Sequence, residues 1–138
     1  MSSTFSEPQA SPAVLKLFLV EDSPAISENL IATLAEMLDV EPMGCARDER
    51  SAIEWMLAPD ARCDLMIIDI FLKAGSGLEV LRRAKVLRPE AKLVVLTNYA
   101  TPDMRRRCDQ LGADRVFDKS AELEQLLSYC ESLVDEAT

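Results

Sequence analysis

The chain has 138 residues, a formal net charge of −9, 49% hydrophobic residues and 28% charged residues. A chain of this length and composition fits one globular domain, which buries roughly two-thirds of its unfolded surface. The acidic charge argues against direct contact with nucleic acid, which needs clustered Lys and Arg. No apolar run approaches the roughly 20 residues of a membrane span, so no membrane contact is expected.

The sequence contains four cysteines and no histidine. A zinc site that uses histidine is therefore excluded, and the cysteines show no CxxC spacing that would favour another kind. Scattered cysteines predict reduced thiols, which are typical of the cytoplasm. We therefore expect a cytoplasmic protein whose cysteines serve in packing.

Residues 1–13 are rich in Ser, Pro and Thr and offer almost nothing to bury, so we expect a disordered segment there. Residues 14–137 are expected to form one domain. A short apolar run, turn residues and a helical pattern alternate five times in this part of the chain. The expected strands span residues 15–20, 42–46, 65–68, 93–96 and 115–117.

Each expected strand is followed by a helix with a recognisable start or apolar face. The residues expected to cap helices are Ser23, Asp48, Thr101 and Ser120, and Gly112 is expected to end the fourth helix. The side chains expected to face inward include Ile26, Leu30 and Leu34 in the first helix and Ile53, Met56 and Leu57 in the second.

Apolar strands that alternate with helices predict an α/β fold with a parallel sheet covered on both faces. Right-handed crossovers favour a flavodoxin-like, doubly wound sheet of five strands in the order 2-1-3-4-5. This order places the three most apolar strands at the centre of the sheet. Sites in such sheets form where the carboxyl ends of the strands meet.

Charged and polar side chains follow four of the expected strands. Glu21 and Asp22 follow the first, Asp69 closes the third, Thr97 closes the fourth, and Lys119 follows the fifth. Three clustered carboxylates repel one another unless a cation is present, and oxygen ligands suit Mg²⁺ or Mn²⁺. A carboxylate beside such a cation can attack phosphorus, while an amine and a hydroxyl stabilise the phosphoryl oxygens.

Five short motifs occur in order and at a spacing known from one family. They are Val20-Glu21-Asp22-Ser23, Ile68-Asp69 with Gly77 eight residues later, Leu96-Thr97, Gly112-Ala113-Asp114 and Asp118-Lys119-Ser120. Through these motifs the chain resembles a receiver domain of a two-component response regulator over about residues 14–136. Each motif alone is weak, whereas the ordered set is specific.

The resemblance implies that Asp69 accepts a phosphoryl group from a phosphohistidine of a sensor histidine kinase or a phosphotransfer protein. Lys119 would pair with the phosphoryl group, and Thr97 would move to hydrogen-bond it. The implied protein is a regulatory switch and not an enzyme, with at most slow self-phosphorylation and self-dephosphorylation. The implied ligands of Mg²⁺ or Mn²⁺ are Glu21, Asp22, Asp69 and the backbone carbonyl of Phe71.

The surroundings of the phosphoacceptor depart from the family pattern. Asn98 replaces the small residue that usually follows the switch threonine. Val116 occupies the position of the usual aromatic switch residue, and Phe117 points to the other face of its strand. Phe71 and Tyr99 are bulky residues two positions after the phosphoacceptor and the threonine, where we expect them to shield the site from water.

Three other functions are weighed against the phosphoacceptor switch. A pseudo-receiver would bind partners without phosphorylation, although it usually lacks one of the site residues. A receiver cut from a longer DNA-binding regulator has the same motifs. A magnesium phosphatase of the haloacid dehalogenase type would need a second aspartate where Phe71 stands.

The charges of the fourth and fifth helices suggest a homodimer. The fourth helix is basic at 105–107, whereas the fifth is acidic, so a two-fold contact could join them. Two solvated faces explain the same pattern equally well. The downstream partner is expected to be a protein. The acidic residues of the fifth helix are Glu122, Glu124, Glu131, Asp135 and Glu136.

Overall fold

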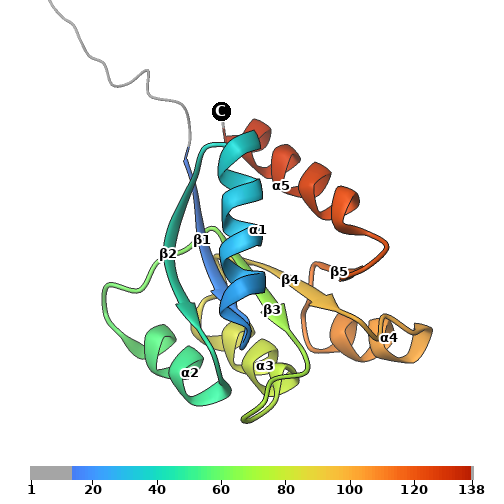
Figure 1. The fold of residues 1–138 in the computed structure, drawn as a ribbon. Helices are drawn as coiled ribbons and strands as arrows, with labels where there is room; N and C mark the ends of the chain where they lie inside the picture. The colour runs from blue at the N-terminus through green and yellow to red at the C-terminus, as the bar shows by residue number, and fades with distance from the viewer. Residues whose placement is uncertain (1–13, 138) are drawn as a thin grey trace, which may run out of the picture.

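The computed structural model describes residues 14–137, so the disorder predicted for residues 1–13 lies outside the described residues. Five parallel strands in the order β2-β1-β3-β4-β5 alternate with five helices, which confirms the predicted flavodoxin-like architecture (Figure 1). The elements are β1 (Leu15–Val20), α1 (Pro24–Met37), β2 (Val40–Ala46), α2 (Glu49–Leu57), β3 (Leu65–Asp69), α3 (Gly77–Leu87), β4 (Lys92–Thr97), α4 (Pro102–Gln110), β5 (Arg115–Asp118) and α5 (Leu123–Ala137).

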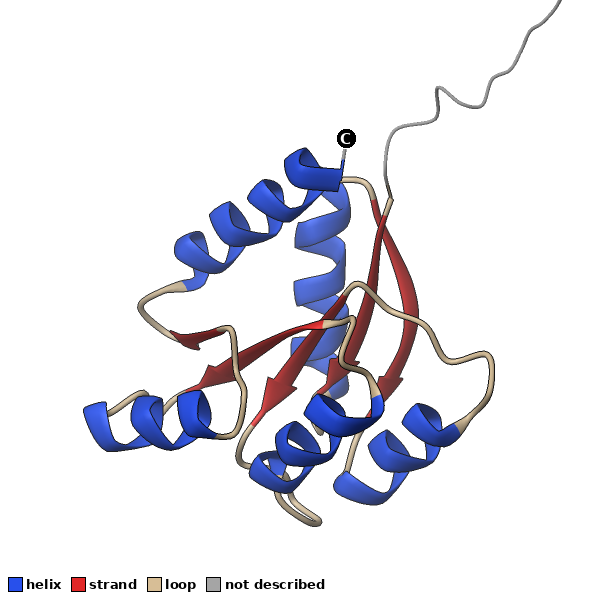
Figure 2. Ribbon diagram, turned by 180° about the vertical axis from the view of Figure 1, so that it is seen from behind, coloured by secondary structure: helices blue, strands red, loops and turns tan. Residues whose placement is uncertain are grey.

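Two hydrophobic clusters cover the two faces of the sheet. The helices α1 and α5 cover one face of the sheet, and α2, α3 and α4 cover the other (Figure 2). Phe18 and Val20 of β1 belong to the cluster on the side of α2, α3 and α4, whereas Leu17 and Leu19 belong to the cluster on the side of α1 and α5. This alternation is the two-residue period of a strand. The core strands β1, β3 and β4 are therefore buried on both faces. Within residues 14–137, no helix has the length and apolar character that crossing a membrane requires.

The predicted starts of three helices are confirmed. Ser23 Oγ accepts the amide hydrogen of Ile26 at 3.3 Å, and Thr101 Oγ1 accepts that of Met104 at 3.1 Å. Asp48 forms a capping box with Ser51 at the start of α2. The helix α4 ends before Gly112, whose φ of +106° suits glycine, as predicted.

The predicted cap of the last helix is wrong. The helix α5 begins at Leu123, three residues beyond Ser120. The amides of Ser120 and Ala121 instead donate to Asp118 Oδ1 at 2.8 and 2.9 Å, because an aspartate readily closes a turn with the amides that follow it. The chain thus turns once more before the helix starts.

Two side chains predicted to face inward are exposed. Ile26 is 42% exposed, because Ser27 takes the buried position in the first turn of α1. Leu57 is 58% exposed at the end of α2, where burial follows Ala52 and Met56 at the four-residue spacing. Both errors arise from extending an apolar stripe into a terminal turn of a helix, the first turn of α1 and the last turn of α2.

The four cysteines are free thiols. Cys63, Cys108 and Cys130 are buried as expected for packing residues, whereas Cys45 is exposed on β2. Burial raises the pKa of Cys63 and of Cys130 to about 12, so these two thiols stay protonated at neutral pH.

Gly77 lets α3 begin directly against the segment that follows Asp69. A Cβ atom at this position would lie 2.0 Å from the Asp69 carbonyl oxygen and 2.5 Å from the Ile70 Cα atom. The Gly77 amide donates to the Ile70 carbonyl at 3.0 Å. Because the obstructing atoms belong to the backbone, a larger residue can be accepted only if β3 or α3 shifts.

We expect Gly77→Ala to lower the free energy of unfolding by about 2 kcal/mol or more, since overpacking costs roughly 1–3 kcal/mol. Gly44→Ala is the matched control, because the nearest atoms to its Cβ atom belong to side chains, the Phe18 ring at 3.2 Å and Trp55 Nε1 at 3.5 Å. Urea denaturation followed by circular dichroism measures the free energy of unfolding of both variants. This signal does not depend on the fluorescence of Trp55, whose side chain lies near Gly44. Equal losses in the two variants would show that the backbone approach at Gly77 does not matter.

Candidate functional site

The predicted site residues meet at the carboxyl edge of the sheet. Glu21 and Asp22 follow β1, and Asp69 ends β3. Carboxylate oxygens of these three residues lie within 4.8 Å of one another. Glu21 and Asp69 are buried and Asp22 is partly buried, so the carboxylates form one compact acidic cluster.

Lys119 joins two of the three carboxylates. Its Nζ lies 2.8 Å from Glu21 Oε1 and 3.1 Å from Asp69 Oδ2, and the Lys119 side chain is only 14% exposed. Burial raises the pKa of the Glu21 carboxyl, and the bonds from Lys119 and the Ser23 amide only partly oppose it. Burial alone would lower the pKa of the Lys119 ammonium, but its bonds to both carboxylates hold this pKa above its usual value. The cation at the centre of the site is therefore Lys119.

The loop after β3 wraps around the acidic cluster and donates to it. The Phe71 amide donates to Asp69 Oδ1 at 3.1 Å, and the Lys73 amide donates to Asp22 Oδ2 at 2.8 Å. These bonds orient one oxygen of each carboxylate. The backbone of Phe71 therefore adjoins Asp69, as the predicted role of its carbonyl requires.

Glu49, at the start of α2, holds the far end of the same loop. Its Oε1 accepts the Ser76 amide hydrogen at 2.9 Å, and its own amide donates to the Ala74 carbonyl at 3.3 Å. Sequence reasoning missed Glu49, because the contact joins segments 27 residues apart and no motif marks it. The loop is thus fixed both to the acidic cluster and to α2.

Thr97 lies at the end of β4 and is fully buried. Its Oγ1 accepts the Tyr99 amide hydrogen at 3.1 Å, and its carbonyl accepts the Lys119 amide hydrogen at 2.9 Å. Thr97 is therefore bonded both to the loop after its own strand and to the residue that carries the central cation.

The predicted access residues also come together. Phe71 is 50% exposed and Tyr99 is 61% exposed, and their rings meet edge to face with centroids 4.9 Å apart. Asn98 is exposed, and its Oδ1 accepts the Ser120 hydroxyl at 3.4 Å. An exposed aromatic pair thus joins the loop after Asp69 to the loop after Thr97.

Val116 and Phe117 point to opposite faces of β5, as predicted. Phe117 is buried in the cluster under α1 and α5, whereas Val116 packs against the other cluster. The Val116 carbonyl accepts a hydrogen bond from Arg105 Nη1 at 2.9 Å. Sequence reasoning treated Arg105 as a surface charge and missed this contact, which depends on how α4 packs against β5.

The donor set fits a hard divalent cation. Glu21, Asp22 and Asp69 offer oxygen atoms alone, which Mg²⁺ and Mn²⁺ prefer over the nitrogen and sulfur ligands of zinc. The cluster also combines three negative groups with one ammonium. A cation is the simplest compensation for the remaining negative charge.

Comparison with known proteins gives one family. The model of the response regulator receiver domain matches residues 17–131. A putative transcriptional regulator of Pseudomonas aeruginosa is 33% identical over 119 residues, which cover 86% of this chain and 56% of that protein. The transcriptional regulatory protein DltR of Streptococcus agalactiae is 31% identical over 83% of this chain and 49% of its own length. The chain spans about half the length of these curated relatives.

Solved structures show the same fold. A CheY-like receiver domain protein from Methanospirillum hungatei is 26% identical with a TM-score of 0.75, covering 90% of this chain and 96% of that one. The phosphorylated cyanobacterial phytochrome response regulator RcpA is 27% identical with a TM-score of 0.69, covering 88% and 91%. With the family match and the strand order in agreement, the chain belongs to the response regulator receiver domains of two-component signalling.

Proposed function

We propose that this protein is a phosphoacceptor switch in which Asp69 takes a phosphoryl group from the phosphohistidine of a sensor histidine kinase or a phosphotransfer protein. The observation that carries the proposal is the setting of Asp69. Its two oxygens accept hydrogen bonds from Lys119 Nζ and the Phe71 amide, both at 3.1 Å, within the acidic cluster. The similarity to RcpA, whose structure is that of the phosphorylated protein, supports the same role.

The transfer follows from the groups present. A carboxylate oxygen of Asp69 attacks phosphorus, and the phosphorus–nitrogen bond to the donor imidazole breaks as the new phosphorus–oxygen bond forms. The imidazole leaves with the electron pair of the broken bond and takes a proton from solvent. Lys119 supplies positive charge to the phosphoryl oxygens, and the Thr97 hydroxyl donates a hydrogen bond to them.

Glu21, Asp22, Asp69 and the Phe71 carbonyl would hold Mg²⁺ or Mn²⁺. Such an ion, when bound, offsets the charge of the carboxylates and of the phosphoryl oxygens. Either oxygen of Asp22 could bind the ion, and one of them, Oδ2, also accepts the Lys73 amide hydrogen. The Lys73 amide fixes the side chain in either case.

Incubation with acetyl phosphate and Mg²⁺ tests the proposed transfer. We expect about one stable phosphoryl group per chain, none in Asp69→Ala, and labelling roughly 10-fold slower or more in Asp22→Asn because the metal site is weakened. Asp60→Ala, at an exposed aspartate outside the cluster, should behave as the parent protein. Continuous release of phosphate would indicate a phosphatase, and absence of labelling would indicate a pseudo-receiver.

We further propose that the aromatic pair Phe71 and Tyr99 shields the aspartyl phosphate from water. Contacting aromatic rings stabilise each other by about 0.5–1.5 kcal/mol beyond the burial of their area, so each ring helps to hold the other in place. Both side chains are at least half exposed, so they can close over a bound group. The exclusion of water would lengthen the life of the phosphorylated state without any change to the transfer chemistry.

Phe71→Asn and Tyr99→Ala should each lose phosphate several-fold faster than the parent protein, as measured by the decay of labelled protein. Since the rings contact each other, the double variant should be little faster than either single variant. Val86→Ala removes another exposed apolar side chain, on α3, and should leave the decay unchanged. Unchanged decay in both ring variants would contradict shielding.

A homodimer through α4 and α5 stays a prediction. Arg105 forms an ion pair with Glu122 of the same chain, and Arg106 forms one with Asp103. Both contacts reduce the basic charge that α4 can offer to a second copy. A two-fold contact would therefore depend strongly on the third arginine, Arg107.

Sedimentation with and without beryllofluoride, a phosphoryl mimic, measures this association. We expect a shift toward twice the chain mass of 15.3 kDa at low salt, reversed at high salt because exposed charges are screened. Arg107→Glu should abolish the shift, whereas Arg50→Glu on α2 should not. A monomer under all four conditions would refute the dimer.

A receiver segment of a DNA-binding regulator is the second candidate. It is favoured by the curated relatives, which are named as transcriptional regulators and are about twice as long as the matched segment. The net charge of −9 still argues that this chain itself does not contact DNA. In both cases we propose a cytoplasmic switch, which the free thiols fit, with a protein contact as its immediate output and only slow self-dephosphorylation as catalysis.

A further inference from the structure

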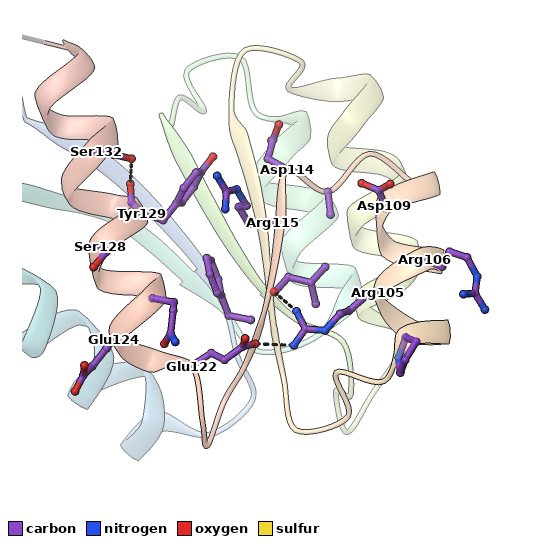
Figure 3. Close-up of a pocket in the computed structure, with 15 residues that line it drawn as sticks. Arg105, Arg106, Asp109, Asp114, Arg115, Glu122, Glu124, Ser128, Tyr129 and Ser132 are labelled. Carbon is purple, nitrogen blue, oxygen red and sulfur yellow. Dashed lines mark hydrogen bonds and ion pairs between the residues drawn. The ribbon is translucent and has the colours of Figure 1, made fainter.

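Arg105, in the first turn of α4, binds three separate segments through one guanidinium group. Its Nε donates to the Ala100 carbonyl at 3.1 Å, its Nη1 to the Val116 carbonyl at 2.9 Å, and its Nη2 to Glu122 Oε1 at 2.6 Å. Figure 3 shows Arg105 reaching from α4 toward β5 and Glu122. We call Arg105 with these three partners the Arg105 clasp. A planar group with five N–H donors suits such a fixed arrangement.

Both sides of the clasp lie next to the phosphoacceptor site. Ala100 belongs to the loop after Thr97. In this loop the Tyr99 amide donates to Thr97 Oγ1. Glu122 Oε1 also accepts the Asp118 amide hydrogen at 2.9 Å, and the next residue is Lys119. The clasp therefore connects the segments that carry the switch threonine and the central lysine.

The clasp also borders an open surface. A cavity of about 1050 Å³ lies between α4 and α5 over β5, and Arg105, Val116 and Glu122 all line it (Figure 3). Because β5 is an edge strand, the Val116 carbonyl is open to a partner from outside the sheet. The bond from Arg105 lowers the pKa of the Glu122 carboxyl, so this carboxylate stays ionised at neutral pH. Any movement of the clasp changes the wall of this cavity.

The residue at position 116 explains why an arginine can connect α4 with β5. Receivers often place an aromatic switch residue at this position, whereas this chain has a valine that is partly buried against the core. A valine side chain offers no hydrogen bond and no large ring that could change rotamer. Instead, Arg105 of α4 donates a hydrogen bond to the Val116 carbonyl in the backbone of β5.

We propose that Arg105 is a positioning residue that couples the state of Asp69 to the α4–β5–α5 surface, in place of an aromatic switch. The inference rests on the proposed function. The clasp stabilises the arrangement in which the Thr97 hydroxyl accepts the Tyr99 amide hydrogen, because it holds the carbonyl of the next residue, Ala100. Movement of Thr97 toward a phosphoryl group draws this loop along, weakens the clasp and alters the cavity wall. Coupling between two sites is reciprocal, so loss of the clasp must change binding at Asp69.

Titration with beryllofluoride and Mg²⁺, followed by the amide resonances of the protein in solution, tests the coupling. In the parent protein we expect shifts near the acceptor, at Phe71 and Lys73, and on the distant surface, at Arg115 and Ser128. In Arg105→Ala the two distant resonances should lie near their bound positions before beryllofluoride is added. The affinity for beryllofluoride should rise roughly 5-fold or more.

Matched variants separate coupling from a loss of stability. Glu122→Gln keeps the shape of the clasp but removes its negative charge. Its beryllofluoride affinity and its distant resonances should therefore change in the same direction as those of Arg105→Ala, by a smaller amount. Arg106→Ala removes a neighbouring arginine that also lines the cavity but pairs with Asp103 of its own helix, so its beryllofluoride affinity should match that of the parent protein. Parent-like affinity and parent-like distant resonances in Arg105→Ala and Glu122→Gln would overturn the coupling alone. A parent protein that shows no shift at Phe71 and Lys73 would overturn the phosphoacceptor function and, with it, this inference.

Discussion

The ammonium of Lys119 holds together two buried carboxylates, Glu21 and Asp69, that would otherwise repel each other. Because these groups come from the ends of β1, β3 and β5, the contact requires the observed strand order. A buried ion pair adds little net stability, since desolvation offsets most of the attraction, yet removal of one partner costs roughly 3–5 kcal/mol. The arrangement therefore constrains the edge of the sheet while adding little to the free energy of folding. Such a set of charges fits a role in chemistry better than a role in stability.

The loop after β3 depends on the same cluster and is fixed at three points. Asp22 accepts the Lys73 amide hydrogen, Glu49 accepts the Ser76 amide hydrogen, and Gly77 packs on the backbone that follows Asp69. The loop that follows Asp69 is therefore held through its backbone, by two carboxylates and by the packing of Gly77. In the proposed transfer, a group held in this way would be oriented before the phosphoryl donor arrives, which would lower the barrier.

Local patterns in the sequence predicted most of the architecture. Apolar runs predicted the strands and their order, and Asp48 and Thr101 marked helix starts, because both signals depend on residues close in the chain. The prediction that Ser120 caps the last helix is wrong because the carboxylate of Asp118 binds the amides at this turn. A pattern of single residues does not resolve that competition. The contacts of Arg105 could not be predicted, since they depend on the packing of α4 against β5.

In the proposed switch, the hydroxyl of Thr97 links access to the site with its output. It accepts the amide hydrogen of Tyr99 at 3.1 Å, and this bond is kept only if the loop moves together with the hydroxyl. A movement of Thr97 toward a phosphoryl group therefore favours a movement of the loop with it. The same loop carries the Tyr99 ring that contacts Phe71 and the Ala100 carbonyl that binds Arg105. Under the two proposals, the lifetime of the phosphoryl group and the shape of the α4–β5–α5 surface could not be tuned independently, because one short loop would control both.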